Sequence, residues 1–356
     1  MAPGMVRVAL RRTLREVKYV EAVRPRRARG LVKDVYRQVE RDFGMLAPPI
    51  ALHSASPDAL AAAWLMLRES LVAGGAARRA DKEVVAAAVS AANSCPYCVE
   101  VHAMALGSLG DPDAAAAIEA DTVTAIRDRD TRELAAWARG EGPLPADVSA
   151  PAAAELAAVA VTFHYLNRMV NVFLGPSPLP ASVPPSARAK AKAVLGFLLK
   201  PGEAPPPGES LELLPAASAD SPDRASPGSV LGEAFARASA AIGAAGERSV
   251  PAGVRDLVRR EIKAWDGKPP GLSRAWTEPV LAELPAADRP AGRLALLAAQ
   301  APYQVDAADV AAFRPDGTDD RALVELVSWA SLTAAVAAGD RLPVRPPRED
   351  PAVRRG

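Results

Sequence analysis

Cysteine and histidine are scarce in this chain, whose 356 residues include only two cysteines and three histidines. A structural zinc site needs four ligands, so the shortage argues against a zinc-stabilised fold. One pair of cysteines, with none elsewhere, fits a protein of the reducing cytoplasm. Any thiol or imidazole chemistry must therefore come from very few positions.

Aromatic residues and net charge are also low, at 4% and +1. The low aromatic content leaves no evident stacking platform for single-stranded nucleic acid. The low net charge argues against nucleic acid as a bulk binding partner. No apolar run reaches the length of a membrane span, and the basic N-terminal region lacks the apolar segment of a secretory signal. We therefore predict no nucleic-acid partner, no membrane span and a cytoplasmic location.

The sequence is instead rich in alanine, and 49% of its residues are hydrophobic. Alanine favours helix, and no segment has the alternating pattern of a strand. The chain is long enough for two domains. These features predict an all-α protein with a sizeable core.

The chemistry-bearing residues gather in one stretch, from Glu83 to His102. Cys95 and Cys98 stand in C-x-x-C spacing, His102 follows four residues later, and Glu83 precedes the first cysteine by twelve. An apolar helix is expected to end near residue 92. Asn93 and Ser94 are typical helix caps, and a new helix is expected to begin at the cysteines.

This arrangement places both thiols in the first turn of a helix, where the free N–H groups and the helix dipole favour an anion. Thiols in such a C-x-x-C pair are expected to have lowered pKa values. Cys95, Cys98 and His102 share one helix face, so His102 can exchange a proton with Cys98. Glu83 can reach them only if the chain turns and the two helices pack together.

The pattern E-x11-C-x2-C-x3-H, formed by Glu83, Cys95, Cys98 and His102, resembles the active-site signature of the alkylhydroperoxidase D-like branch of the carboxymuconolactone decarboxylase family. The resemblance covers about residues 48–175. It includes the lead-in segments Leu52-His53-Ser54, Pro57 and 61–71, and Asn167-Arg168 at the end of an apolar helix.

The resemblance implies a tandem of two helical units, the second of which has lost its cysteines. We predict five segments. They are a basic arm and helix at 1–47, a catalytic unit at 48–178, a Pro-rich linker at 179–228 interrupted by a helix at 187–199, a degenerate unit at 229–343, and a disordered tail at 344–356.

By the same resemblance the protein is expected to be a thiol-dependent hydroperoxide reductase. Cys98 would attack the peroxide, Cys95 would resolve the product to a disulfide, and His102 with Glu83 would move the proton. No bound cofactor or metal is expected. The expected partners are a hydroperoxide, an external dithiol reductant of lipoyl or thioredoxin type, and further copies of the chain. The helix argument alone does not decide which cysteine is the nucleophile.

Other interpretations stay open on the sequence alone. The family also includes decarboxylases and isomerases of small ring acids, although such chemistry needs no dithiol. The C-x-x-C pair could serve a non-catalytic redox sensor, which would oxidise once and stop. Cys95 and Cys98 could be buried and inert, and His164 could be a core histidine or a polar group beside the site.

Overall fold

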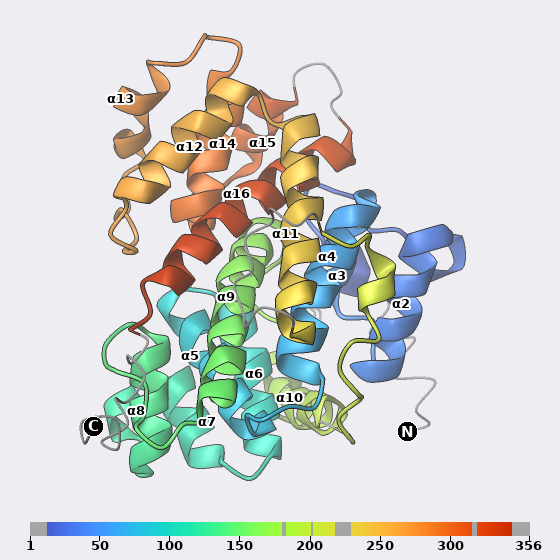
Figure 1. Ribbon diagram of the computed structural model, residues 1–356, viewed down its shortest axis with the longest axis vertical. Coiled ribbons are helices and arrows are strands. Elements are labelled where there is room, and N and C mark those ends of the chain that lie inside the picture. The colour runs from blue at the N-terminus through green and yellow to red at the C-terminus, as the bar shows by residue number, and fades with distance from the viewer. Residues whose placement is uncertain (1–12, 180–182, 201, 218–228, 315–318, 344–356) are drawn as a thin grey trace, which may run out of the picture.

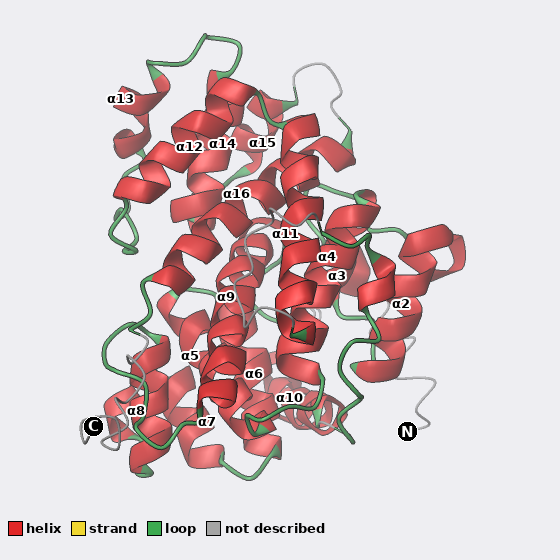
Figure 2. Cartoon of the chain, in the orientation of Figure 1, coloured by secondary structure: helices red, strands yellow, loops and turns green. Residues whose placement is uncertain are grey.

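The computed structural model describes residues 13–179, 183–200, 202–217, 229–314 and 319–343 (Figure 1). Within these ranges every regular element is a helix, and no strand occurs (Figure 2). The predicted all-α class is confirmed. The predicted disordered tail lies outside the described residues.

The first half of the chain supplies the helices around the two cysteines. They are α2 (Gly30–Asp42), α3 (Pro48–Ala51), α4 (Pro57–Leu67) with a π-helical continuation at Arg68–Val72, α5 (Arg79–Ala92), α6 (Pro96–Ser108), α7 (Pro112–Glu119), α8 (Arg129–Ala138), α9 (Ala150–Phe173) and α10 (Pro185–Leu199). The helix predicted at 187–199 is therefore confirmed as α10.

The second half supplies a further group of helices. They are α11 (Val230–Ser249), α12 (Ala252–Ala264), α13 (Glu278–Leu281), α14 (Arg289–Gln300), α15 (Ala307–Phe313) and α16 (Asp320–Asp340). Two short 3₁₀ helices precede α2, at Thr13–Glu16 and Pro25–Arg27. Others lie between the longer helices, at Leu52–Ala55, Val123–Ala125, Leu211–Leu213, Ala275–Thr277 and Pro302–Gln304.

Proline and capping side chains set where several of these helices begin. Pro57, Pro96 and Pro112 each occupy the first turn of a helix, where the missing N–H costs nothing. Asp111 caps α7 by accepting a hydrogen bond from the backbone N–H of Ala114. The helix α7 ends at Glu119, and Asp121 turns the chain directly after it with φ of +55°.

The helix α9 lies near the centre of the molecule and joins its two halves (Figure 1). It packs against α4, α5 and α6 from the first half and against α14 and α16 from the second. The Tyr165 hydroxyl and Ser328 Oγ are hydrogen bonded at 2.7 Å, and Arg168 donates to the carbonyl of Ala299 at 2.8 Å. One hydrophobic core runs through both halves. The tandem of two units, with its boundaries, stays a prediction.

The helix α16 carries a buried carboxylate that is a counterpart of Glu83. The segments Arg79-Ala-Asp-Lys-Glu83 and Arg321-Ala-Leu-Val-Glu325 both place arginine four residues before glutamate, and both pairs are bonded at 2.8 Å. Glu325 also accepts from Arg248 at 2.8 Å and from Ser56 at 2.9 Å. Burial would raise the pKa of Glu325, but these donors outweigh burial and lower it to about 2. Among the described residues, none of the hydrogen bonds to Glu325 comes from a histidine.

The helix α16 is also long and apolar enough to cross a membrane, with a mean hydropathy of 1.5. The expectation that no stretch reaches membrane length is therefore wrong for this segment. However, 72% of the stretch is buried inside the protein. Its apolar character is accounted for by packing against α9, α11 and α14.

Candidate active site

The turn between α5 and α6 sets the position of the cysteines. Asn93 ends α5 as its C-cap residue, and Ser94 reverses the chain with φ of +51°. Because the reversal occurs at Ser94, the N-cap of α6 is Cys95, and Pro96 is the first helical residue. The prediction that Asn93 or Ser94 caps the start of the second helix is therefore wrong, because the N-cap lies one or two residues later, at Cys95. Cys98 still lies in the first turn.

The chain turns after α5, and α5 and α6 pack as the hairpin on which the predicted contact between Glu83 and His102 depended. His102 Nδ1 lies 2.7 Å from Glu83 Oε2, although 19 residues separate them. Both side chains are buried. The other carboxylate oxygen, Glu83 Oε1, accepts a hydrogen bond from Arg79 Nε at 2.8 Å. Glu83 is therefore held between a cation and an imidazole.

This pairing keeps Glu83 ionised and places a hydrogen on Nδ1 of His102. Burial alone would raise the pKa of Glu83, but Arg79 and His102 outweigh burial and hold the pKa below its ordinary value. An ionised carboxylate only accepts hydrogen bonds, so Nδ1 of His102 carries the hydrogen that points to Glu83. In the neutral form of the ring, Nε2 then carries the lone pair that can take a proton.

Two residues that hold this pair were missed by the sequence analysis. Phe163 of α9 packs edge-on against the His102 ring, with centroids 4.4 Å apart and planes at 82°. It restricts the orientation of the imidazole. No sequence signal marks Phe163 among the apolar residues of α9. Arg79 did carry a signal, since arginine four residues from glutamate on one helix is a common ion pair.

Cys98, His102 and Tyr97 line a cavity of about 60 Å³, which has room for a few water-sized molecules. Burial raises the pKa of Tyr97, so this side chain stays a neutral hydroxyl. The rest of the lining is apolar. It comprises Phe43, Met45, Ala47, Pro48, Pro49, Ile50, Leu67, Val101, Phe163, Leu166, Val170, Pro178, Leu195 and Leu199.

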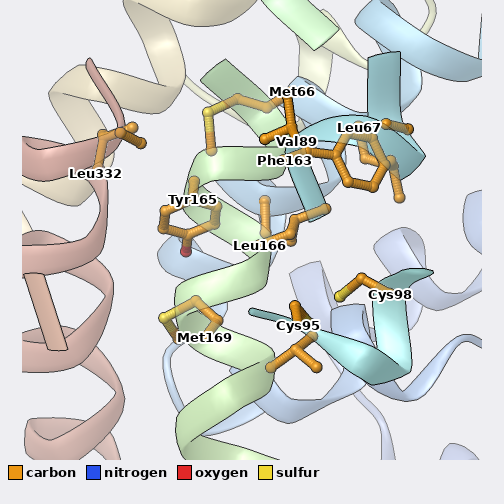
Figure 3. Packing of buried hydrophobic residues seen from close by; sticks show 14 of the residues in the cluster. Met66, Leu67, Val89, Cys95, Cys98, Phe163, Tyr165, Leu166, Met169 and Leu332 are labelled. Atoms are coloured by element: carbon orange, nitrogen blue, oxygen red, sulfur yellow. The ribbon is translucent and has the colours of Figure 1, made fainter. Parts of the chain in front are cut away.

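Of the two cysteines, Cys98 lines this cavity, and Cys95 packs beside α9 near Met169 (Figure 3). Both thiols are free and almost fully buried, with Cys95 1% exposed and Cys98 4% exposed. Burial and the neighbouring Cys98 thiol raise the pKa of Cys95. The expectation of thiolate character at both positions is therefore wrong for Cys95, because desolvation outweighs the effect of the helix terminus.

A network of amides lies on the Cys95 side of the pair. Asn167 of α9 donates to Ser90 Oγ at 3.0 Å and accepts from Asn93 at 2.9 Å. Asn93 in turn is hydrogen bonded to His164 Nδ1 at 3.0 Å. Burial, and then Arg168, lower the pKa of His164 to about 3, so the ring is neutral. His164 thus lies next to the turn that carries Cys95.

In the described part of the chain, no group of three or more histidine, cysteine, aspartate or glutamate side chains is placed to hold a metal ion. The site combines a thiol pair, an imidazole oriented by Glu83, and a small, largely apolar cavity that is lined by Cys98 and His102.

Comparison with known proteins agrees with this arrangement. The family model described as "Carboxymuconolactone decarboxylase family" matches residues 58–139, a range that includes Glu83, Cys95, Cys98 and His102. The chain is 39% identical over 328 residues to alkyl hydroperoxide reductase Rv2159c of Mycobacterium tuberculosis, an alignment that covers 91% of this chain and 94% of the relative. No solved structure matches the chain. The similarity to this relative, together with the family match across the site, shows that the chain belongs to the carboxymuconolactone decarboxylase family.

Proposed function

We propose that the protein reduces organic hydroperoxides with the Cys95–Cys98 pair and is reset by an external dithiol. The observation that carries the proposal is the hydrogen bond between Glu83 and His102, because it orients an imidazole that lines the same cavity as Cys98. The name of the M. tuberculosis relative supports the same class of substrate.

In the first step Cys98 is the nucleophile. His102 Nε2 takes the thiol proton, and the thiolate attacks the terminal peroxide oxygen. The O–O bond breaks, Cys98 becomes a sulfenic acid, and the alkoxide leaves as an alcohol with the proton returned by His102. Cys98 is favoured as the nucleophile because it lines the cavity, whereas Cys95 does not.

In the second step Cys95 resolves the sulfenic acid. Its sulfur attacks Cys98 Sγ, a disulfide forms, and the hydroxyl leaves as water with the proton of Cys95. The raised pKa of Cys95 suits this order, because Cys95 stays a thiol until a partner sulfur appears. A dithiol then returns two electrons and two protons through a mixed disulfide.

The cavity lining favours this reaction over the decarboxylation of a ring acid. A substrate carboxylate needs a cation, and among the described residues that line the cavity there is no lysine or arginine. Arg79 is held by Glu83 and lines a different pocket. The apolar walls suit the hydrocarbon part of an organic hydroperoxide.

Turnover is the first prediction. With cumene hydroperoxide and excess dihydrolipoamide, the protein is expected to consume many equivalents of peroxide per chain, measured by loss of peroxide over time. A redox sensor would consume one equivalent and stop. A ring-acid decarboxylase would leave both cysteines reduced, release carbon dioxide from its substrate and fail to consume peroxide.

A further inference from the structure

The helix α10 covers the active-site cavity without belonging to the main core. Leu195 and Leu199 line the cavity, and with Met45 and Leu179 they form a small hydrophobic cluster of their own. Lys192 Nζ holds α10 to Glu100 of α6 at 3.2 Å and to Glu119 of α7 at 2.9 Å. Access to Cys98 from this side therefore passes α10.

The outer face of α10 is unusual for a helix of a folded protein. Phe197 is 77% exposed and Val194 is 44% exposed, and two exposed lysines, Lys190 and Lys200, flank them. At 100° per residue, positions 190, 193, 197 and 200 fall on one stripe, opposite Leu195 and Leu199. We call Lys190, Ala193, Val194, Phe197 and Lys200 the outer face of α10.

The charge of this helix is of one sign. From residue 185 to residue 200 the sequence contains Arg188, Lys190, Lys192 and Lys200 and no aspartate or glutamate. Neither Lys190 nor Lys200 has a carboxylate partner among the described residues. An occupant of the outer face must therefore offer carboxylates around an apolar contact.

We propose that the outer face of α10 docks the dithiol carrier that reduces the Cys95–Cys98 disulfide, an acidic protein with an apolar contact patch. This inference rests on the proposed function, which requires such a reductant. Two side chains of α10 line the cavity, so a carrier on the outer face lies only one helix diameter, about 10 Å, from it. The face presents Phe197, an exposed aromatic residue of a type enriched at interfaces, between two lysines that can pair with carboxylates of the carrier.

Other occupants fit the charge poorly. A second copy that docked α10 against α10 would bring lysines of one chain against lysines of the other. Residues 1–12 contain Arg7, Arg11 and Arg12 and no acidic residue, and residues 344–356 contain four arginines against Glu349 and Asp350. The terminal segments of the chain therefore carry the same sign as the face that they would have to cover.

The chemistry of the docked complex balances as a dithiol–disulfide exchange. A thiolate of the carrier attacks Cys98 Sγ, which lines the cavity, and Cys95 leaves and is protonated to a thiol. The second carrier thiol attacks the mixed disulfide and releases Cys98. The carrier ends as a disulfide and the protein as a dithiol. Carboxylates of the carrier can also compete with Glu100 and Glu119 for Lys192, which loosens α10 over the cavity.

The test compares a protein-borne dithiol with the same dithiol free in solution. The double variant Phe197→Ser, Lys190→Glu changes only exposed residues that do not line the cavity. Steady-state peroxide reduction would be measured with a purified dihydrolipoyl domain, with reduced thioredoxin and with free dihydrolipoamide. The matched control is Leu272→Ser with Lys268→Glu, because Leu272 is 94% exposed and both residues lie in the second half.

With the protein donor that serves the wild type best, the α10 variant is expected to lose about tenfold or more in kcat/KM, and the control is expected to lose nothing. The wild-type rate with that donor should fall as salt rises. With free dihydrolipoamide both variants should match the wild type. Equal rates of variant and wild type with the protein donor would overturn the docking surface, as would protein donors no faster than free dihydrolipoamide. Absence of turnover with every dithiol would overturn the proposed function itself.

Discussion

Replacement of Cys98 by serine is expected to abolish peroxide reduction, since a hydroxyl in that position is a far weaker nucleophile than a thiolate. Cys98 is the cysteine that lines the cavity, and His102 lies one turn farther along the same helix face. The measurement is peroxide consumption with excess dihydrolipoamide, made on protein whose helical content by circular dichroism matches the wild type.

Replacement of Cys95 by serine tests its proposed role as the resolving cysteine. Cys98 should still react once with peroxide, but no thiol is then available to resolve the product. A Cys98 sulfenic acid should accumulate, and dimedone should trap it in a form that mass spectrometry locates. If dimedone instead labelled residue 95 in the Cys98→Ser protein, with no label on Cys98 in the reverse variant, the two roles would be exchanged.

Loss of the Glu83–His102 pair is the second change with a large expected effect. His102→Ala removes the group that accepts the proton, and a positioned acid–base group typically contributes about 10²–10⁴-fold. Glu83→Gln keeps the size of the side chain but removes the charge that holds Nδ1–H toward it. Both variants should therefore be slow at neutral pH, as measured by the initial rate of peroxide reduction.

The pH dependence separates this role from a structural one. At high pH hydroxide can remove a thiol proton without a positioned base, so the defect of both variants should shrink. Glu325→Gln is the control, because Glu325 is equally buried and has the same arginine four residues before it. That variant should keep the wild-type rate and pH profile. Wild-type rates in His102→Ala at neutral pH would mean that the terminus of α6 activates Cys98 alone.

The sequence was sufficient for the parts of the site that depend on local spacing. The helical spacing placed Cys98 and His102 one turn apart, and the break after residue 92 allowed Glu83 to reach them only if α5 and α6 packed as a hairpin. The hydrogen bond from His102 to Glu83 confirms that packing. The all-α class followed from composition in the same way, because alanine-rich segments without alternation have one regular structure available to them.

The parts that depend on tertiary burial were not predictable. The raised pKa of Cys95 comes from the helices that enclose it, and a local argument from the helix terminus gives the opposite sign. Phe163 is one of many apolar residues of α9, and only the fold shows that its ring meets His102. Likewise the cover that α10 forms over the cavity depends on a contact between segments about 90 residues apart, which a single sequence does not report.

The measurement that tests the central claim most directly is the state of the two thiols after one equivalent of peroxide. Folded full-length protein would be treated with cumene hydroperoxide, alkylated and digested, and the peptide containing Cys95 and Cys98 would be weighed by mass spectrometry. The account predicts an intramolecular Cys95–Cys98 disulfide with no alkylated thiol, converted back to two alkylated thiols after dihydrolipoamide is added. Two alkylated cysteines in the peroxide-treated protein would contradict it.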